Sequence, residues 1–312
     1  MKKILAFLIA VGVSLSANAA ETITIVSGYN AAATVHNAMY KIIDIANKSQ
    51  NRYNFILDFK PGAGGVVALN YISQNPTTRV ALLSTGIIQE FDEKRVIESD
   101  FTPIYAVGDA CWGVATNLPA DESKGIKSIR NPKGNDIVIG AVGSGSVSHI
   151  IGLESAEAAH LKPIVLLFKS PSDAMINQAG NQGVNLNLET VEAIKNVQTR
   201  NKDIKLVGIT CGQRHPLVPK IPTLAEQGMK NIPSVFNIVY APTQMYATRQ
   251  TDIGRILDQA TLQLGDKEMF ELSGFKSPVF SKNPVSAQQF YDVRAAQLRT
   301  LTKKYANQIT KN

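Results

Sequence analysis

The sequence has few of the residues that metal and redox sites require. Its 312 residues include 2 cysteines and 4 histidines. Cys111 and Cys211 lie far apart and form no Cys-x-x-Cys pattern, which argues against a thiol redox centre or a cysteine zinc site. No two histidines have the spacing of four residues that helical zinc ligands show; the four are His36, His149, His160 and His215. We therefore expect no metal.

Signatures of common enzymes are also missing. No serine stands at the centre of a Gly-x-Ser-x-Gly motif, so the nucleophile elbow of α/β hydrolases is absent. The glycines of residues 62–65 do not complete a dinucleotide-binding fingerprint, because Val67 stands where its third glycine should be and no Gly-Lys-Ser/Thr follows. We expect no cofactor and no enzymatic activity.

Long hydrophobic runs are absent except at the N-terminus. Lys2 and Lys3 precede an apolar run over residues 4–15, and residues 17–19 (Ala-Asn-Ala) fit the small-x-small rule for signal cleavage. The run is shorter than the roughly 20 residues that cross a bilayer, so a cleaved signal peptide over residues 1–19 is favoured over a membrane anchor. This pattern predicts a periplasmic protein.

Composition and charge are those of an ordinary globular protein. Hydrophobic residues make up 44% and charged residues 18% of the chain, and its length predicts two domains. The formal net charge is +7, but lysines and arginines are scattered rather than gathered in stripes, so we expect no nucleic-acid partner. A mild positive excess attracts anions. In an oxidising periplasm Cys111 and Cys211 either pair or remain two buried thiols, and the sequence leaves both open.

Apolar β-branched runs alternate with helical patterns, which predicts an α/β fold on largely parallel sheets. One predicted helical face carries Val35, Met39, Ile42 and Ala46, and a second carries Phe290, Val293, Leu298, Leu301 and Tyr305. The predicted strands, including two short runs expected to be buried at 137–142 and 163–168, are 22–26, 55–59, 80–84, 104–115, 137–141, 164–168, 184–188, 204–210 and 236–241.

Three turns rich in small residues lie between a predicted strand and a predicted helix, where open α/β sheets hold ligands. They span residues 27–34, 61–65 and 143–149. The third turn offers backbone N–H groups at a helix start, where the helix dipole favours an anion. A plain serine N-cap would satisfy the same donors internally. In the second turn, glycines that let a helix pack close to its sheet are at least as plausible as ligand contact.

Several of these motifs together resemble one family. The resemblance rests on residues 60–65 (Lys-Pro-Gly-Ala-Gly-Gly), 80–86, 143–149, Phe168-Lys169-Ser170 with Ala174, and 216–228. In this order they resemble the signature of the tripartite tricarboxylate transporter substrate-binding proteins, the Bug family. The last motif, Pro-Leu-Val-Pro-Lys-Ile-Pro-Thr-Leu-Ala-Glu-Gln-Gly, is the most specific of them.

The resemblance implies a two-domain periplasmic-binding-protein fold, a type II-like Venus flytrap with crossover hinge strands. Domain 1 would comprise residues 20–110 and 238–312, and domain 2 residues 111–237. It further implies a monomer that captures a small organic acid, a carboxylate, between the domains and delivers it to membrane permease subunits.

The ligand-binding residues that the resemblance implies lie in four segments, with Glu189 near the hinge as a weaker candidate. They are Ser27, Tyr29, Asn30, Ala32, Thr34, Ser84, Thr85, Gly143, Ser144, Gly145, Ser146, Ser148, His149, Phe168, Lys169 and Glu189.

The chain also departs from the family pattern. The aspartate common at the first helix start is Val35, acids common elsewhere are Asn177 and Asn185, and the glycine of Tyr-Lys-Gly is Ser170. These changes remove negative charge, so the ligand need not be the same. Two alternatives stay open: a ligand-binding component of periplasmic signalling, and a secreted serine hydrolase in which His149 activates Ser146 or Ser148.

Overall fold

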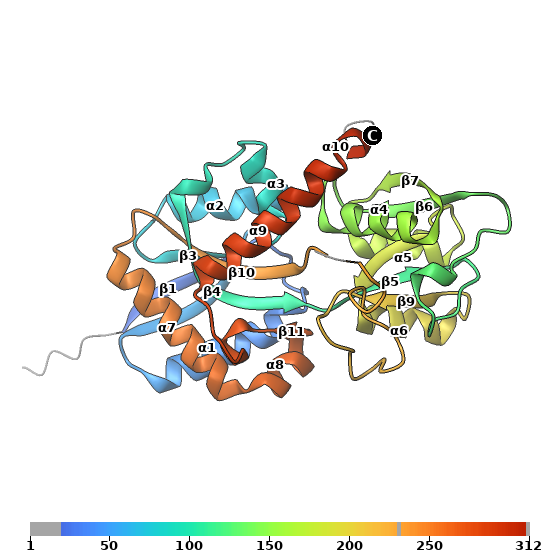
Figure 1. Cartoon of the computed structure of the whole chain (residues 1–312). Coiled ribbons are helices and arrows are strands. Elements are labelled where there is room, and N and C mark those ends of the chain that lie inside the picture. Colours follow the sequence, from blue (N-terminus) through green and yellow to red (C-terminus); the bar gives the residue numbers. More distant parts are fainter. Residues whose placement is uncertain (1–19, 230–231, 310–312) are drawn as a thin grey trace, which may run out of the picture.

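The computed structural model describes residues 20–229 and 232–309, which form two α/β lobes, each built on its own sheet (Figure 1). The predicted signal peptide, residues 1–19, lies outside the described residues. Within these ranges, no helix combines the length and the apolar character needed to cross a membrane.

The first lobe contains a six-stranded sheet in the order β11-β4-β10-β3-β1-β2. Strands β1 to β3 are parallel, and β10 runs antiparallel between β3 and β4. Their bounds are β1 (Glu21–Ser27), β2 (Tyr53–Phe59), β3 (Arg79–Ser84), β4 (Phe101–Ala110), β10 (Val235–Pro242) and β11 (Phe275–Lys276).

Helices cover both faces of this sheet because its side chains alternate between two cores. Ile23 and Ile25 of β1 face one core, and Val26 faces the other. The first core holds α1 (Val35–Ser49), α7 (Ala247–Leu264) and α8 (Asp266–Ser273). The second holds α2 (Val66–Ser73), α3 (Ile87–Asp92) and α9 (Ala287–Lys304).

The predicted helical faces are largely confirmed. All four residues of the first face are buried. On the second face, the prediction for Val293 is wrong, because its side chain is 51% exposed while the other four are buried. α9 lies on the molecular surface, so its buried stripe is narrower than the periodicity suggests.

The second lobe contains a five-stranded sheet in the order β7-β6-β8-β5-β9. β6, β7 and β8 are parallel, and β5 is antiparallel to both β8 and β9. The strands are β5 (Trp112–Thr116), β6 (Asp136–Ala141), β7 (Lys162–Leu167), β8 (Leu186–Thr190) and β9 (Lys205–Ile209). The helices are α4 (Val147–Ala159), α5 (Pro171–Ala179) and α6 (Val191–Arg200). A 3-10 turn at 126–128 belongs to this lobe, and those at 63–65, 98–100 and 278–280 belong to the first lobe.

The expectation of largely parallel sheets is wrong, because both sheets are mixed and antiparallel pairings join β10 to β3 and β4, and β5 to β8 and β9. Two strand predictions also need correction. The predicted strand 104–115 is two strands, because the chain leaves the first sheet at the end of β4 and enters the second as β5. The run at 163–168 is not buried: Ile164, Leu166 and Leu167 are 46%, 40% and 48% exposed. β7 is an edge strand, and α5 packs on β6 and β8, so part of β7 remains uncovered.

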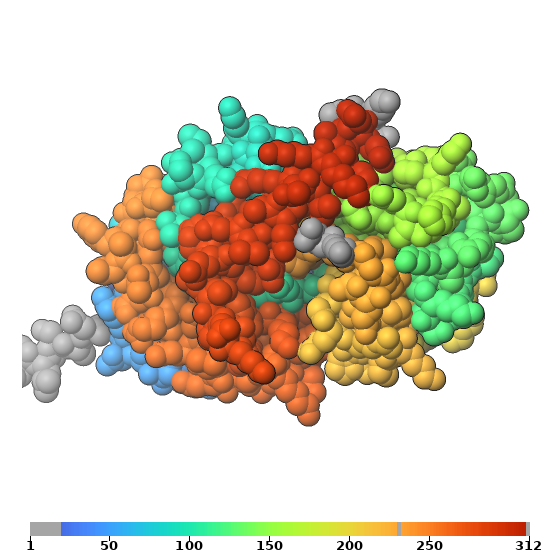
Figure 2. Space-filling view, in the orientation of Figure 1, coloured from blue at the N-terminus to red at the C-terminus, as the bar shows by residue number. Residues whose placement is uncertain are grey.

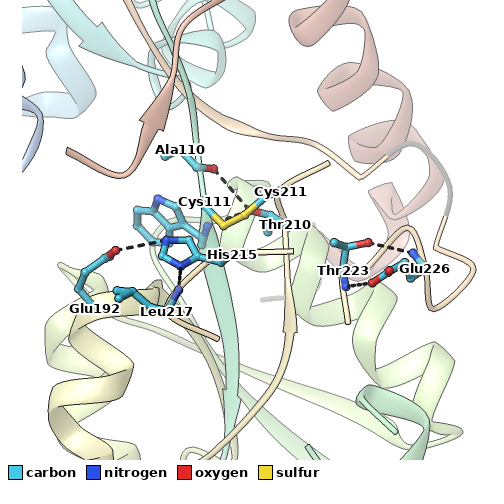
Figure 3. Close-up of a disulfide and its surroundings, with 10 residues drawn as sticks. Ala110, Cys111, Glu192, Thr210, Cys211, His215, Leu217, Thr223 and Glu226 are labelled. Atoms are coloured by element: carbon cyan, nitrogen blue, oxygen red, sulfur yellow. Dashed lines mark hydrogen bonds and ion pairs between the residues drawn. A yellow bond between two sulfur atoms is a disulfide. The ribbon is translucent and has the colours of Figure 1, made fainter. Parts of the chain in front are cut away.

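The break between β4 and β5 carries a disulfide (Figure 3). Cys111 stands between the two strands, and Cys211 follows β9, with a Cα–Cα distance of 4.9 Å. Of the two alternatives that the sequence left open, the disulfide is therefore the one present. It fixes the crossing chain against the end of β9. Beside it, the His215 ring lies 4.7 Å from the ring of Phe270 in α8, a contact between the lobes.

The C-terminal helix α9 makes a second connection between the lobes (Figure 1). Arg294 pairs with Asp109 of β4 in the first lobe. Further along the chain, the Tyr305 hydroxyl donates to the carboxylates of Glu154 and Glu157 in α4, at 2.9 and 2.7 Å. The short helix α10 (Ala306–Ile309) continues toward the second lobe. The chain end thus contacts both lobes.

Candidate functional site

The first turn begins at a buried serine at the end of β1. The Ser27 hydroxyl lies 2.8 Å from Nε2 of His36 and accepts the Tyr29 N–H at 3.2 Å. Ser27 is fully buried. Its hydroxyl therefore holds the turn from within.

Tyr29 reaches from this turn to the centre of the first sheet. Its hydroxyl donates to Oδ1 of Asn237, which pairs with Ser84 across β10 and β3. Burial raises the pKa of Tyr29, and hydrogen bonds to Ser84 and Asn237 partly offset that rise. The tyrosine therefore stays a neutral hydroxyl. Sequence reasoning missed Asn237, although a lone asparagine in an apolar strand is a detectable signal.

The rest of the first turn presents its backbone. The N–H groups of Asn30, Ala31 and Ala32 make no hydrogen bond to any residue that the structure describes. The side chains of Asn30, Ala32 and Thr34 are exposed. This turn can therefore offer main-chain donors to an anion.

Ser84 and Thr85, at the end of β3, have different roles. The Ser84 hydroxyl accepts the Gly86 N–H at 3.3 Å and is partly exposed. Thr85 is buried, and its hydroxyl accepts the Phe236 N–H at 2.7 Å. Thr85 thus fastens this segment to β10, whereas Ser84 lies beside Tyr29.

The glycines of the second turn serve close packing. Gly65 has a φ of +108°, and a Cβ there would lie 2.8 Å from the Leu83 side chain. A Cβ on Gly64 would lie 2.6 Å from Oε1 of Glu90. These contacts support the structural interpretation of the second turn over direct ligand binding.

The third turn is the second lobe's counterpart of the first. Ser146 caps α4 by accepting the His149 N–H at 3.3 Å, and the Ser148 hydroxyl accepts the Val142 N–H at 2.9 Å. The N–H groups of Ser144, Val147 and Ser148 have no hydrogen-bond acceptor within the described chain. N-capping and free donors therefore coexist here.

The Ser144 side chain is engaged by the other end of the chain. Its hydroxyl donates to the Ile309 carbonyl at 3.0 Å. A Cβ on neighbouring Gly145 would lie 3.7 Å from Thr302 and 3.8 Å from Ile309. The C-terminal segment thus lies directly against the third turn.

The arrangement around His149 does not fit a serine hydrolase. Its Nδ1 accepts the Gly145 N–H at 3.0 Å, and neither ring nitrogen bonds a serine hydroxyl among the described residues. Burial lowers the pKa of the ring. A general base must reach the proton that it removes, and His149 reaches neither Ser146 nor Ser148.

The last predicted segments lie at the ends of β7 and β8. Phe168 is half-buried and Lys169 is exposed. Glu189 is buried, and its carboxylate accepts the Thr190 N–H at 2.9 Å and the Ser172 hydroxyl at 3.1 Å. Burial raises the pKa of Glu189, with these two hydrogen bonds opposing the rise.

One close approach brings the third turn near α3 of the first lobe. A Cβ on Gly143 would lie 3.7 Å from Oε1 of Gln89, in the helix that follows Ser84. The space-filling view shows a furrow between the surfaces of the two lobes (Figure 2). No cluster of three or more potential metal ligands occurs in the ranges that the structure describes.

Comparison with known proteins places this geometry in context. No protein-family model matches the chain. A UPF0065 protein encoded in the tcbD-tcbE intergenic region of Pseudomonas sp. strain P51 is 24% identical over 204 residues, which cover 61% of this chain and 58% of that protein. The match thus spans less than two thirds of the relative's length.

Solved structures match over nearly the whole chain. The periplasmic binding protein BugD is 19% identical, with a TM-score of 0.65 and coverage of 93% of this chain and 97% of BugD. MatC from Rhodopseudomonas palustris, with bound malate, is 18% identical, with a TM-score of 0.66 and coverage of 90% and 99%.

Rpa4515 from the same organism, with adipate, is 17% identical, with a TM-score of 0.70 and coverage of 91% and 96%. The chain therefore has the two-domain fold of periplasmic binding proteins, as the sequence predicted. The structural neighbours are those that the sequence resemblance pointed to.

Proposed function

We propose that this chain belongs to the Bug family of tripartite tricarboxylate transporter substrate-binding proteins and, without catalysing a reaction, captures a small organic carboxylate between its lobes. One observation carries the proposal: each lobe presents a strand-to-helix turn in which some backbone N–H groups have no acceptor among the described residues. The donors belong to residues 30–32 in one lobe and to Ser144, Val147 and Ser148 in the other. Malate and adipate in two structural neighbours support a carboxylate.

In this proposal the sixteen predicted site residues divide by what they do. The backbone of residues 30–32 and of the third turn contacts the ligand, with Tyr29, Thr34 and Ser84 beside it. Ser27 and Thr85, whose hydroxyls are spent on internal bonds, hold the turns in place. Phe168, Lys169 and Glu189 complete the second lobe's side. Asn237 joins the set because it fixes the Tyr29 hydroxyl.

Affinity follows from a small number of such contacts. A hydrogen bond to a charged group contributes about 1.5 to 3 kcal/mol, so two or three beyond the cost of association reach micromolar binding. A ligand that touches both lobes stabilises the closed arrangement only by its additional contacts there. A dicarboxylate suits two facing sets of donors better than a monocarboxylate.

The cellular role completes the proposal. A cleaved signal peptide over residues 1–19 would export the chain to the periplasm, where it would act as a monomer and deliver its ligand to membrane permease subunits. Domain 1 then comprises residues 20–110 and 238–312, and domain 2 comprises residues 111–237, except that residues 235–237 go with domain 1 because β10 lies in the first sheet. The disulfide is compatible with an oxidising compartment.

Calorimetry tests the binding proposal directly. The natural protein would be titrated with malate, adipate, citrate and benzoate, and its melting temperature measured with each. At least one dicarboxylate should bind with micromolar affinity and raise the melting temperature. Absence of both heat and melting shift across the panel would refute a carboxylate receptor, provided that native mass spectrometry shows no acid retained from purification.

A further inference from the structure

The first turn (27–34) and the third turn (143–149) are each hydrogen-bonded by a buried histidine. In both cases the histidine lies at the start of the helix that follows. His36 is the second residue of α1 and His149 the third residue of α4, and they are 1% and 0% exposed. The two contacts are made by equivalent parts of two different lobes.

His36 bonds two residues of the first turn directly and a third through Ser27. Its Nδ1 lies 3.0 Å from the Ala31 carbonyl, and only a protonated nitrogen can bond a carbonyl oxygen. In the neutral ring, Nε2 is then the acceptor for the Ser27 hydroxyl at 2.8 Å. The Ser27 oxygen in turn accepts the Tyr29 N–H. One imidazole thus fixes both sides of the turn.

His149 acts on the third turn through a single bond. Its Nδ1 accepts the Gly145 N–H at 3.0 Å, so that nitrogen carries no proton. Gly145 has a φ of +74°, in the left-handed region that favours glycine. The bond therefore holds a residue whose backbone conformation would otherwise be free to change. It also removes the Gly145 N–H from the donors open to a ligand.

We infer that His36 and His149 are matched positioning residues, which as neutral imidazoles hold the two turns in the conformation that presents their free N–H groups. The inference rests on the proposed function, because the turns matter only if a ligand contacts them. Simple packing makes a different prediction. An apolar side chain of similar size would replace a packing residue, whereas only a side chain with an acceptor can replace His149.

The test compares two substitutions at His149 with a control in the same helix. His149→Asn places Oδ1 near the position of Nδ1 and keeps the acceptor, and His149→Leu removes it. His160→Asn is the control, because His160 is exposed at the end of α4 with a φ of +57°, which asparagine tolerates.

The first measurement needs no ligand. Amide hydrogen exchange at Gly145 should rise about tenfold or more in His149→Leu, as expected for the loss of one buried hydrogen bond. It should return toward the natural rate in His149→Asn and stay unchanged in His160→Asn. Natural exchange at Gly145 in His149→Leu would overturn the positioning role.

The second measurement is the calorimetric Kd for adipate. We expect it to rise about tenfold in His149→Leu and to recover in His149→Asn. If adipate binds the natural protein and all three variants equally, the inference is wrong while the proposed function stands. If the natural protein binds no carboxylate, the proposed function fails, and the exchange measurement still decides the role of His149.

The first turn supplies an independent arm in case His149→Leu does not fold. Ser27→Ala removes the hydroxyl between His36 and the Tyr29 N–H and leaves the histidine in place. Exchange of the Tyr29 amide should rise, and exchange at Gly145 in the other lobe should not. A Tyr29 amide that exchanges at its natural rate would contradict the same inference for His36.

Discussion

The first and third turns look alike in sequence but are supported differently. The first turn is held by residues of its own lobe: His36, Leu82 of β3 and Asn237 of β10. The third turn is held by His149 and also by the far end of the chain, through the bond from Ser144 to Ile309. The conformation of the third turn is therefore coupled to how the two lobes sit, whereas that of the first is not.

Removing the disulfide should give the largest difference in stability between the two lobes. Cys111→Ser with Cys211→Ser opens a loop of 100 residues that is built almost entirely into the second lobe. We expect a loss of about 2 to 4 kcal/mol in the free energy of unfolding, measured by urea denaturation. Exchange should increase in β5 and β9 and remain natural in β1 and β2. Equal loosening of both sheets would contradict the independence of the first lobe.

Acid should weaken both histidine contacts. Burial lowers the pKa of His36 and of His149, so the folded protein takes up fewer protons than the unfolded chain, whose histidines titrate near 6.5. The two neutral histidines contribute fully to the free energy of unfolding above pH 6.5. That contribution is lost as the pH falls from 6.5 through the lowered pKa values, by at most about 1.4 kcal/mol per pH unit for each histidine. Urea melts between pH 7 and 5 should show a shallower slope in His149→Asn. An unchanged slope would show that His149 does not contribute.

Weakening the contact with the chain end, which Lys304 also makes through ion pairs to Glu154 and Glu157, should affect the third turn alone. Tyr305→Phe removes the hydroxyl that donates to Glu154 and Glu157, at a cost of about 1 kcal/mol. Exchange at residues 143–149 should rise while residues 27–34 keep their natural rates. Tyr246→Phe, on a side chain that is 77% exposed, is the matched control. Faster exchange in both turns would mean that the first also depends on the chain end.

The smallest effect concerns the outer surface of the helix behind the first turn. Lys48 and Asp44 form an exposed ion pair on α1, with side chains 74% and 55% exposed. Lys48→Ala should change the free energy of unfolding by less than about 0.5 kcal/mol. It should leave the Tyr29 amide protected, because α1 holds the turn through His36. Faster exchange of the Tyr29 amide in this variant would show that the exposed surface of α1, and not His36 alone, holds the first turn.

Local patterns in the sequence were sufficient for the elements and the turns. Apolar β-branched runs located nine strand regions, and small residues after β1 and β6 located the two turns with free donors. A local pattern could not reveal the break at Cys111, because whether a strand stays in one sheet depends on which distant strands become its neighbours. It also could not reveal that β7 is an edge, since that depends on which strands become its neighbours.

The roles of individual site residues depend on distant partners. Ser27 and Thr85 were predicted as ligand contacts from their positions, yet their hydroxyls bond His36 and Phe236. Asn237 lies 208 residues from the tyrosine that it bonds. The same is true of Ser144 and Ile309, which are 165 residues apart. Such pairings come from topology, which a local pattern does not encode.

The exposed edge strand β7 bears on how the protein avoids aggregation. Lys162 donates its N–H to the Asn135 carbonyl just before β6, and Phe168 donates to Ala141 at the end of β6. Alternate residues between them, beginning with Pro163, therefore turn their backbone groups away from β6. Proline has no N–H, and its place in the outward row deprives any approaching strand of one donor without cost to the sheet. We expect Pro163 and the adjacent charged Lys162 to disfavour edge-to-edge pairing of β7, with its exposed apolar side chains, between copies of the protein.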